Sequence, residues 1–537
     1  MKKLNLQWVS DSIGDDYKKW NKGDTVLIQA QTGTGKTYFI KEVLLDELDS
    51  NDRLLFISNR TNLKRQIKKD LLKKHNLTIP ETLEELDGIT KIEKVSITSY
   101  HAISDNNKDS MYGSGEKWNL GNYDYIVMDE VHFLFSDSGF NNKTRFAYDE
   151  LVREHFPYSI KIFISATMHE IRSPIIKRVE QLKSSGFGLD NYNIHEYNTG
   201  NDYSYITAKY FNKINNIINL IKNDMSDEKW LIFISDIGRD GNRILEELGD
   251  EKCSLIKSGT NSDELTSIIN DSKFNKKVLI STKAMDNGVN IDDPLLKNIV
   301  IMTWDRISFI QMLGRKRIDI DNAETVNLYI PTRYKNSFRS KLNDYYKKKK
   351  AVKLLNNDKM EFYRKFDNAL KDFNGMNDIF YREFSTGEIK FNEIGCARLL
   401  GDIKFAEYMV AKFDYIGKYA FIHEQLSWLG LKDSNYDENM ITEVVVNEEV
   451  DSLNKYLNSV VGEKLFNDDQ QKLSDLIINE LITVSPKTDY RTKKLKPSTL
   501  EIIIREQLEL PYAVSKPKKE TKGDMKDKRY IVISKLN

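Results

Sequence analysis

The stretch Thr25 to Thr37, which reads T-V-L-I-Q-A-Q-T-G-T-G-K-T, places the strongest constraint on the fold of this chain. Val26 to Gln29 have the apolar character of a buried strand, and two glycines then lead into a predicted helix, Lys36 to Leu48. Glycines let backbone N–H groups approach an anion, and the N-terminus of a helix adds partial positive charge. The order of strand, glycine loop and helix therefore predicts a phosphate-binding loop.

The residue types of this loop suit a nucleoside triphosphate. Lys36 can reach the β- and γ-phosphates, and the Thr37 hydroxyl can ligate Mg²⁺. The strict form of the pattern begins with glycine, whereas this chain has Ala30 there, and an ordinary glycine turn is the alternative interpretation. The residues predicted to hold the nucleotide in this loop are Gln31, Thr32, Gly33, Thr34, Gly35, Lys36 and Thr37.

Length and composition limit the class of protein. A chain of 537 residues is too long for one hydrophobic core and indicates several domains, at about 150 residues each. Lys+Arg and Asp+Glu are balanced at 81 each, so any nucleic-acid surface must be local. Cys253 and Cys396 lie far apart without a CxxC, which argues against a disulfide framework or a zinc module. No apolar run approaches the ~18 residues of a membrane span, so we expect a soluble cytoplasmic protein without a membrane partner.

Short apolar runs that end in polar residues recur along the first part of the chain. After the loop they are Arg53 to Ser58, Val95 to Tyr100, Tyr125 to Met128 and Ile160 to Ile164. Helical segments separate them, and this alternation predicts a parallel, doubly wound sheet whose ligands lie at the carboxyl ends of the strands.

A second set of strands follows a segment rich in glycine and asparagine, 186–201, which we interpret as a domain boundary. The predicted strands are Lys229 to Ser235, Cys253 to Lys257, Val278 to Thr282 and Ile299 to Met302, with a helix at Gly241 to Leu248. The sequence therefore predicts tandem α/β domains, 1–200 and 201–335, followed by a mostly helical accessory region, 336–537.

The accessory region is charged and uneven. From 436 to 480 there are eleven acidic and three basic residues, and from 486 to 529 thirteen basic and seven acidic ones. Lys516 to Arg529 has almost nothing to bury, so we predict a flexible basic arm or loop, with nucleic-acid contact as a second interpretation. Tyr415 to Leu431 is apolar and aromatic at near-helical spacing, which predicts a domain core.

The second half of a phosphate site is an acidic residue that follows a buried strand. Asp129 and Glu130 follow Tyr125 to Met128, and here Asp129 can hold Mg²⁺ while Glu130 orients or deprotonates the attacking water. For His132 the structural alternative is a polar side chain satisfied inside the domain. We predict that it links the nucleotide to the second domain.

These motifs resemble those of the superfamily 2 helicases and translocases of the DExH type. The resemblance rests on A-Q-T-G-T-G-K-T, D-E-V-H, Ser165-Ala-Thr167, the segment from Ser281 to Ile291, and Q-M-L-G-R-K-R at 311–317. It covers roughly residues 20 to 330 and implies two RecA-like domains with ATP bound between them.

The resemblance also implies a role for each matching residue. Lys36, Thr37, Asp129 and Glu130 would bind and hydrolyse MgATP, and Ser165 and Thr167 would couple hydrolysis to domain movement. On the second domain, Gly288 and Asn290 match positions near the nucleotide. Gln311 and Arg315 match residues that reach the γ-phosphate across the cleft, where an arginine stabilises the transition state only when the domains close.

The last motif departs from the family pattern. The family commonly has a second arginine three positions after the first, but Ile318 stands there and Arg317 comes one position early. One residue is about 100° of helix rotation, so which of Arg315 and Arg317 acts as the arginine finger stays open. An adenine-reading glutamine motif is not evident upstream of the loop, where only Tyr17, Trp20 and Asn21 stand out.

A nucleic-acid track is predicted at the strand ends of both domains. Arg60 matches a phosphate-contacting arginine of the family, and Thr98, Ser99 and Thr282 offer hydroxyls at corresponding positions. Such contacts go to phosphates and fix register without reading sequence. For each residue taken singly, a solvated loop position is an equal alternative.

Three functions are compatible with these features. The first is an ATP-dependent helicase or translocase, with DNA, single-stranded or duplex, favoured over RNA. The second is a binding or regulatory protein that uses ATP as a switch and holds a protein partner through residues 336–537. The third is the motor subunit of a restriction or defence complex, which translocates without unwinding.

Overall fold

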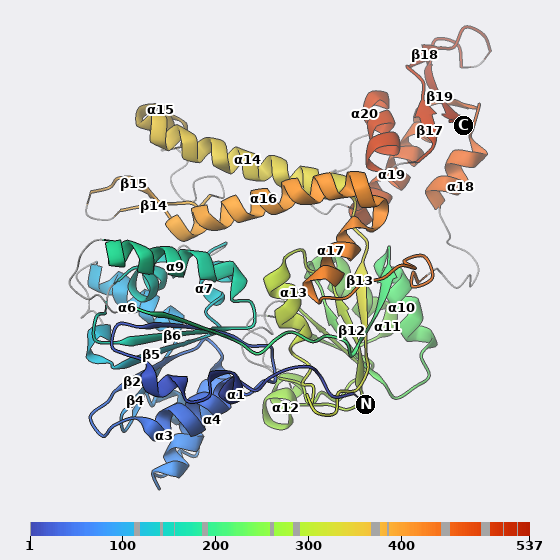
Figure 1. The fold of residues 1–537 in the computed structure, drawn as a ribbon. Helices are drawn as coiled ribbons and strands as arrows, with labels where there is room; N and C mark the ends of the chain where they lie inside the picture. The colour runs from blue at the N-terminus through green and yellow to red at the C-terminus, as the bar shows by residue number, and fades with distance from the viewer. Residues whose placement is uncertain are drawn as a thin grey trace.

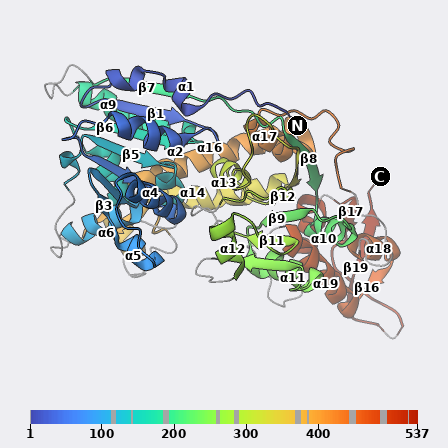
Figure 2. The ribbon, with the colours of Figure 1, turned by 90° about the horizontal axis from the view of Figure 1, so that it is seen from below.

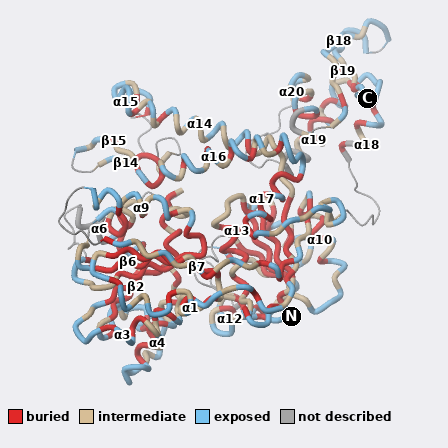
Figure 3. The backbone as a smooth tube through the Cα atoms, in the orientation of Figure 1, coloured by how far each residue is buried: buried red, intermediate tan, exposed pale blue. Residues whose placement is uncertain are grey.

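The fold is that of a computed structural model, which describes residues 2–111, 119–139, 143–154, 156–184, 192–257, 263–282, 290–366, 376–383, 386–441, 452–484, 495–508, 510–523 and 525–536. Two α/β domains lie side by side, and a layer of long helices lies across one side of both (Figures 1 and 2). Buried residues concentrate in the two sheets (Figure 3).

The first domain contains a seven-stranded sheet of order β3-β4-β2-β5-β6-β1-β7, in which only β3 runs antiparallel to its neighbour. Its strands are β1 (Thr25–Gln29), β2 (Leu54–Ile57), β3 (Lys91–Ile92), β4 (Val95–Thr98), β5 (Tyr125–Asp129), β6 (Ile160–Ser165) and β7 (Ile194–Asn198). The central strands are mostly apolar, as expected for a sheet that helices cover on both faces. The strands predicted in this half are confirmed.

Helices of the first domain form two layers. One face is covered by α4 (Thr61–Lys74) and by the helix after the phosphate loop, which runs through α2 (Lys36–Tyr38), a π-helical stretch (Phe39–Leu44) and α3 (Leu45–Glu47). The other face carries α6 (Tyr100–Met111), α7 (Phe133–Asp137), α8 (Thr144–Tyr148) and α9 (His169–Ser184). Shorter helices are α1 (Val9–Ile13) and α5 (Leu83–Gly88).

The second domain contains a six-stranded parallel sheet of order β10-β11-β9-β12-β13-β8. Its strands are β8 (Ile206–Phe211), β9 (Lys229–Phe233), β10 (Cys253–Ile256), β11 (Val278–Ser281), β12 (Leu296–Ile301) and β13 (Val326–Pro331). Its helices are α10 (Ile214–Asn223), α11 (Asn242–Leu248), α12 (Asp263–Asp271) and α13 (Arg306–Leu313). The predicted pair of parallel-sheet domains is therefore confirmed.

The N-terminal segment joins the two domains. The N–H of Leu4 donates to the carbonyl of Ile320 at 2.8 Å, and Lys2 and Ala323 exchange two backbone hydrogen bonds. A few residues later, the N–H of Val9 donates to the carbonyl of Thr34 in the phosphate loop at 2.9 Å. The first residues thus pack against the second domain before the chain enters the first.

A mostly helical region follows the second sheet. It comprises α14 (Lys335–Asn357), α15 (Lys359–Phe366), the hairpin β14 (Phe380–Arg382) and β15 (Ile389–Phe391), α16 (Glu393–Ile416) and α17 (Ala420–Trp428). Phe421, Leu426 and Trp428 are buried in the same core as the second sheet, so the predicted core at Tyr415 to Leu431 is confirmed. None of the helices in the described ranges combines the length and the apolarity that a membrane span requires.

The last part of the chain forms a small domain with its own hydrophobic core. Its elements are α18 (Ser452–Ser459), β16 (Lys464–Leu465), α19 (Asn467–Val484), α20 (Pro497–Ile502) with a π-helical continuation (Ile503–Gln507), β17 (Tyr512–Val514), β18 (Lys518–Lys519) and β19 (Arg529–Lys535). The flexible arm predicted at Lys516 to Arg529 is wrong, because this segment contains β18 and enters β19, whose Ile531 and Ile533 lie in the core.

Candidate nucleotide site between the two sheets

The phosphate loop connects the end of β1 to α2 through two glycines in the left-handed region. Gly33 has φ of +94° and Gly35 has φ of +83°, which other residues adopt only with strain. The Lys36 ammonium donates to the carbonyl of Ala30 at 3.2 Å, which turns the side chain back over the loop. Local geometry therefore gives the loop the shape of an anion cradle.

Glu130 lies at the centre of a cationic cluster. Its carboxylate is 3.6 Å from Lys36 Nζ, 3.5 Å from Arg60 Nη1 and 3.3 Å from His132 Nδ1. Burial opposes its ionisation, but Lys36, His132 and Arg60 outweigh burial and hold the pKa of Glu130 well below its ordinary value. The backbone of Glu130 adopts φ of +50°, an uncommon conformation for a residue with a side chain.

Asp129 is the neighbouring carboxylate at the end of β5. The hydroxyl of Ser58 donates to its Oδ2 at 3.1 Å, and the buried Tyr100 hydroxyl donates to its backbone carbonyl at 2.9 Å. Burial and the charge of Glu130 raise the pKa of Asp129, against the opposing effect of Arg60 and Lys36. A nearby cation would therefore stabilise the ionised form of Asp129.

The second domain brings Gln311 to the same point. From the buried face of α13, the Gln311 amide donates to Glu130 Oε2 at 3.4 Å. Arg315 donates to the Gln311 carbonyl at 3.1 Å and to its side-chain oxygen at 3.0 Å. The amide of Gln311 is thereby held between the carboxylate of one domain and the guanidinium of the other.

Arg317 follows on the same segment and is half-buried. The backbone N–H of Arg317 donates to the carbonyl of Ile291 at 2.8 Å. Burial, and then repulsion from Arg60 and Arg315, lowers the pKa of Arg317 to about 10. The Arg317 guanidinium therefore lies among like charges, and a bound anion would reduce the repulsion between them.

Arg60 lies in the cleft and not on an open surface. It is 8% exposed, and its Nη2 donates to Asn290 of the second domain at 3.0 Å. Its Nε is buried without a hydrogen-bond partner among the described residues. The predicted contact of Arg60 with nucleic acid stays a prediction. Gly288, which was predicted with Asn290, lies outside the described residues.

Other loop residues contact the second domain and the segment that leads into it. The Gln31 side chain exchanges two hydrogen bonds with the backbone of Asp202, at 3.0 Å and 2.9 Å. A Cβ added at Gly314 would lie 2.6 Å from Thr32 Oγ1, so a larger residue there would displace the Thr32 side chain. Thr34 is buried and its hydroxyl donates to the Gln31 carbonyl at 2.8 Å. The loop is therefore enclosed by both domains.

The three residues predicted to couple the domains form one chain of polar contacts with Glu130. His132 Nδ1 is 2.9 Å from Ser165 Oγ, which is 3.2 Å from Thr167 Oγ1. Ser165 Oγ also accepts from the N–H of Thr167 at 3.0 Å. All three side chains are buried, and the chain leads from Glu130 to the end of β6.

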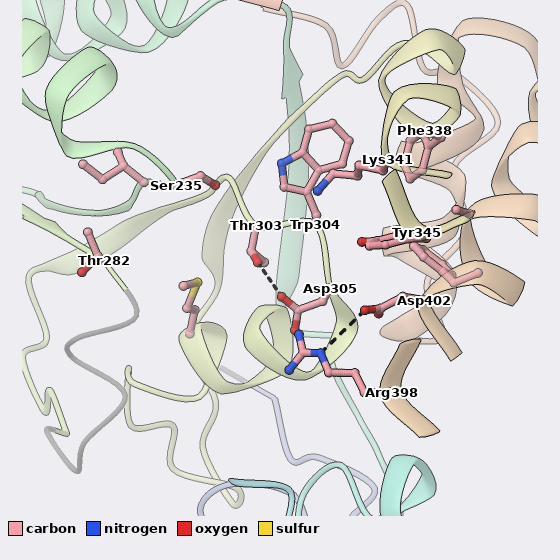
Figure 4. Close-up of a pocket in the computed structure, with 14 residues that line it drawn as sticks. Ser235, Thr282, Thr303, Trp304, Asp305, Phe338, Lys341, Tyr345, Arg398 and Asp402 are labelled. Carbon is pink, nitrogen blue, oxygen red and sulfur yellow. Dashed lines mark hydrogen bonds and ion pairs between the residues drawn. The ribbon is translucent and has the colours of Figure 1, made fainter. Parts of the chain in front are cut away.

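The remaining predicted nucleic-acid residues occupy different surroundings. Thr98 is buried, and the Ser99 hydroxyl accepts from the N–H of Ala102 at 3.1 Å at the start of α6. Thr282 lines a cavity of about 390 Å³ between the second domain and the accessory helices. Trp304 and Lys341 line the same cavity (Figure 4).

Trp8 borders the loop and was missed from the sequence. Its ring lies 3.1 Å from the position of a Cβ added at Gly35, and the side chain is 40% exposed. Tyr17 and Trp20 instead pack around Phe39 in the core. A single aromatic residue forms no periodic pattern in the sequence, so Trp8 could not be predicted. The path of the N-terminal segment along the phosphate loop brings Trp8 next to Gly35.

The composition of the site fits a polyphosphate. The cations gathered here outnumber the carboxylates, and they are Lys36, Arg60, Arg315 and Arg317 against Asp129 and Glu130. The Asp129 carboxylate and the Thr37 hydroxyl are oxygen donors of the kind that Mg²⁺ prefers. Two parallel-sheet domains with a phosphate loop between them define a RecA-like nucleotide-binding protein.

Comparison with known families gives two sequence matches. The profile described as "Type III restriction enzyme, res subunit" matches residues 4–170, and the profile described as "Helicase conserved C-terminal domain" matches residues 212–319. The chain therefore carries a superfamily 2 helicase core. A search of curated proteins finds no match.

Three solved structures are similar to parts of this chain. Dbp5 of S. cerevisiae, bound to RNA and ADP BeF3, is 16% identical, with a TM-score of 0.41 over 59% of this chain and 81% of its own. The DExH-box NTPase HrpB of E. coli is 12% identical, with a TM-score of 0.41 over 81% of this chain and 60% of its own. Lhr of Mycobacterium smegmatis, bound to ssDNA and AMP-PNP, is 14% identical, with a TM-score of 0.39 over 59% of this chain and 44% of its own. The family assignment rests on the two sequence matches.

Proposed function

We propose that the chain is a nucleic-acid-stimulated ATPase that moves along DNA by opening and closing its two α/β domains. The observation that carries this proposal is the hydrogen bond from Gln311 of the second domain to Glu130 of the first. Because the proposed base, Glu130, lies in the first domain and Gln311, which would orient the water, lies in the second, hydrolysis requires that the domains meet.

The contacts of Glu130 suggest how binding prepares the site. Lys36 and Arg60 neutralise the carboxylate while no phosphate competes for them. A triphosphate in the loop would draw both cations toward its oxygens, which releases Glu130 to accept a hydrogen bond from water. Mg²⁺ held by Asp129 and Thr37 would neutralise charge on the phosphates. Gln311, fixed by Arg315, then orients the water and Glu130 takes its proton.

Arg317 is the better candidate for the arginine finger. Arg315 is held by two hydrogen bonds to Gln311, so we assign it to positioning. The Arg317 guanidinium is repelled by Arg60 and Arg315, and a developing negative charge on the γ-phosphate would relieve this repulsion. When Glu130 is released from Lys36 and Arg60, the contacts among His132, Ser165 and Thr167 would transmit this rearrangement to the end of β6.

A nucleic-acid strand would run beneath the accessory helices. The cavity at Thr282 adjoins a second one of about 440 Å³, which is lined by residues of the first domain, the second domain and α16. Arg306 and Arg398 line this second cavity, and Lys341 lines the first. The carboxylates of Glu170, Asp305, Asp402 and Glu424 line the second cavity as well, so only its two arginines suit backbone phosphates, and such contacts carry no sequence information.

The direct test is the steady-state ATPase rate of the full chain with and without single-stranded DNA, single-stranded RNA and duplex DNA. We expect DNA to raise kcat at least tenfold. Slow turnover that no nucleic acid changes would contradict the motor and favour the ATP-switched binding protein.

A second candidate is a motor that translocates without separating strands, and the match to a restriction-enzyme subunit profile favours it. A strand-displacement assay beside a triplex-displacement assay distinguishes the two. Displacement of both a paired strand and a third strand supports a helicase, whereas loss of the third strand alone supports a translocase.

A further inference from the structure

The C-terminal domain has the chain order of a winged helix. Its elements follow one another as helix, strand, helix, helix, strand and hairpin, from α18 to β19. The strands form a sheet of order β16-β19-β17, with the last strand in the centre, and β18 extends the hairpin beyond it. In proteins with two successive helices of this kind, the second helix enters the major groove of DNA.

The domain is complete by itself. Leu457 of α18, Ile477 of α19, Leu500 of α20, Tyr512 of β17 and Ile533 of β19 belong to one buried cluster, and all of its members lie between 453 and 533. The π-helical continuation of α20 adds Ile503 and Ile504 to the same cluster. The helix thus packs with one side on the sheet, and its other side faces outward.

The hairpin of β18 and β19 is strongly basic where it leaves the core. Residues 516–529 include seven basic and three acidic residues, and all seven cations are exposed. Both residues of β18 are exposed lysines, so this strand adds nothing to the buried core. The hairpin extends from the domain on the side away from the two ATPase domains (Figure 1). Such clustered cations repel one another, and phosphates would offset this cost.

The outward side of α20 suits the edges of base pairs. Ser498 and Ile502 of α20 are exposed, as are Lys496 at its N-cap and Arg505 in the π-helical continuation, where Arg505 pairs with Glu501; Thr499 is half-buried. Ile502 is 47% exposed although it is apolar. Hydroxyl, guanidinium and apolar groups on one helix are the groups that hydrogen-bond to bases and contact the thymine methyl.

We propose that the C-terminal domain binds duplex DNA, with α20 in the major groove and the basic hairpin on the adjacent phosphates. The major groove of B-form DNA admits a helix, whereas that of A-form RNA is too deep and narrow for side chains. This binding site does not depend on the ATPase proposal. It would hold the two α/β domains on a DNA duplex while the nucleic-acid strand beneath α16 moves.

The first test measures binding of a blunt 20-bp duplex to the full chain without nucleotide, over a range of salt concentrations. The triple variant Lys522→Gln, Lys526→Gln, Lys528→Gln should bind about 10- to 100-fold more weakly, and its salt slope should fall by about three. The matched control is Lys69→Gln, Lys73→Gln, Lys91→Gln, whose lysines are also exposed but lie in the first domain. Equal losses in both variants, or no loss in the hairpin variant, would overturn the proposal.

The second test concerns α20. Ile502→Glu places a carboxylate where the groove would lie and should weaken duplex binding at least tenfold, whereas the neutral Ile502→Gln should stay within about threefold. Equal binding by both variants would remove α20 from the interface. A duplex RNA of the same sequence should bind more weakly than the DNA, and equal or tighter binding would overturn the assignment to DNA. The ATPase rate of the hairpin variant is also measured with single-stranded DNA. Stimulation of this rate tests the proposed function, whereas duplex binding tests the C-terminal domain, so failure of one proposal is distinguished from failure of the other.

Discussion

Replacing Glu130 by glutamine is expected to lower kcat for ATP about 10²- to 10⁴-fold, the usual contribution of a general base. The amide has nearly the shape of the carboxylate, so the contacts to Gln311 and His132 can persist in altered form. Removing the charge also releases Lys36 and Arg60 for the phosphates, so the Kd for ATP should be unchanged or lower. Single-turnover hydrolysis and a binding titration measure the two quantities.

The control for Glu130→Gln is Glu42→Gln. Glu42 lies in the helix that follows the loop and is exposed, with Lys41 as its ion-pair partner. Glu42→Gln removes one negative charge, as Glu130→Gln does, but leaves the contacts of Glu130 intact. The kcat of this variant should therefore stay within twofold of wild type. A Glu130→Gln enzyme that retains a third or more of the wild-type kcat would show that Glu130 is not the base.

The second large effect is expected for Arg317→Ala, with a loss of about 10³-fold in kcat, the lower range for an arginine finger. ATP affinity should change by less than tenfold, because the contact is made in the transition state. Arg317→Lys should recover little of the rate, since an ammonium does not reproduce the planar fork of the guanidinium. The measurement is kcat against Kd for the two variants.

Arg315→Ala and Arg243→Ala complete this comparison. Arg315→Ala should also lower kcat, through release of Gln311, and Gln311→Ala should then add little to it. Arg243 lies on α11, away from the cleft residues, and its loss should leave kcat unchanged. Full activity in Arg317→Ala beside an inactive Arg315→Ala would reverse the assignment of finger and positioning residue.

Much of the fold follows from local sequence patterns. The buried strands β1, β2, β5, β6, β9, β11 and β12 each contain a run of three or more apolar residues, and each was predicted. Strands β7 and β8 lie at the edges of their sheets, where half-exposed residues such as His195 and Lys209 weaken the apolar signal. Strand β13 was also missed, because Asn327 interrupts its apolar run and Pro331 ends it.

The site was predicted less evenly. Within the loop at 30–37, and within the D-E-V-H segment at 129–132, the residues are close in sequence, so motif spacing was enough to predict each group. The cleft position of Arg60 and the path of the N-terminal segment past Gly35 depend on contacts between distant parts of the chain. Likewise, the basic segment after Lys516 has almost no apolar residues of its own, and its hairpin depends on pairing with β19.

The most direct test of the shared site is the DNA-stimulated ATPase rate of Lys36→Ala, Gln311→Ala and the double variant. The first residue belongs to one domain and the second to the other. If the site is complete only when the domains meet, each single variant loses the stimulated rate and the double variant is little worse than the weaker single one. A stimulated rate within twofold of wild type in Gln311→Ala would contradict a site shared between the two domains.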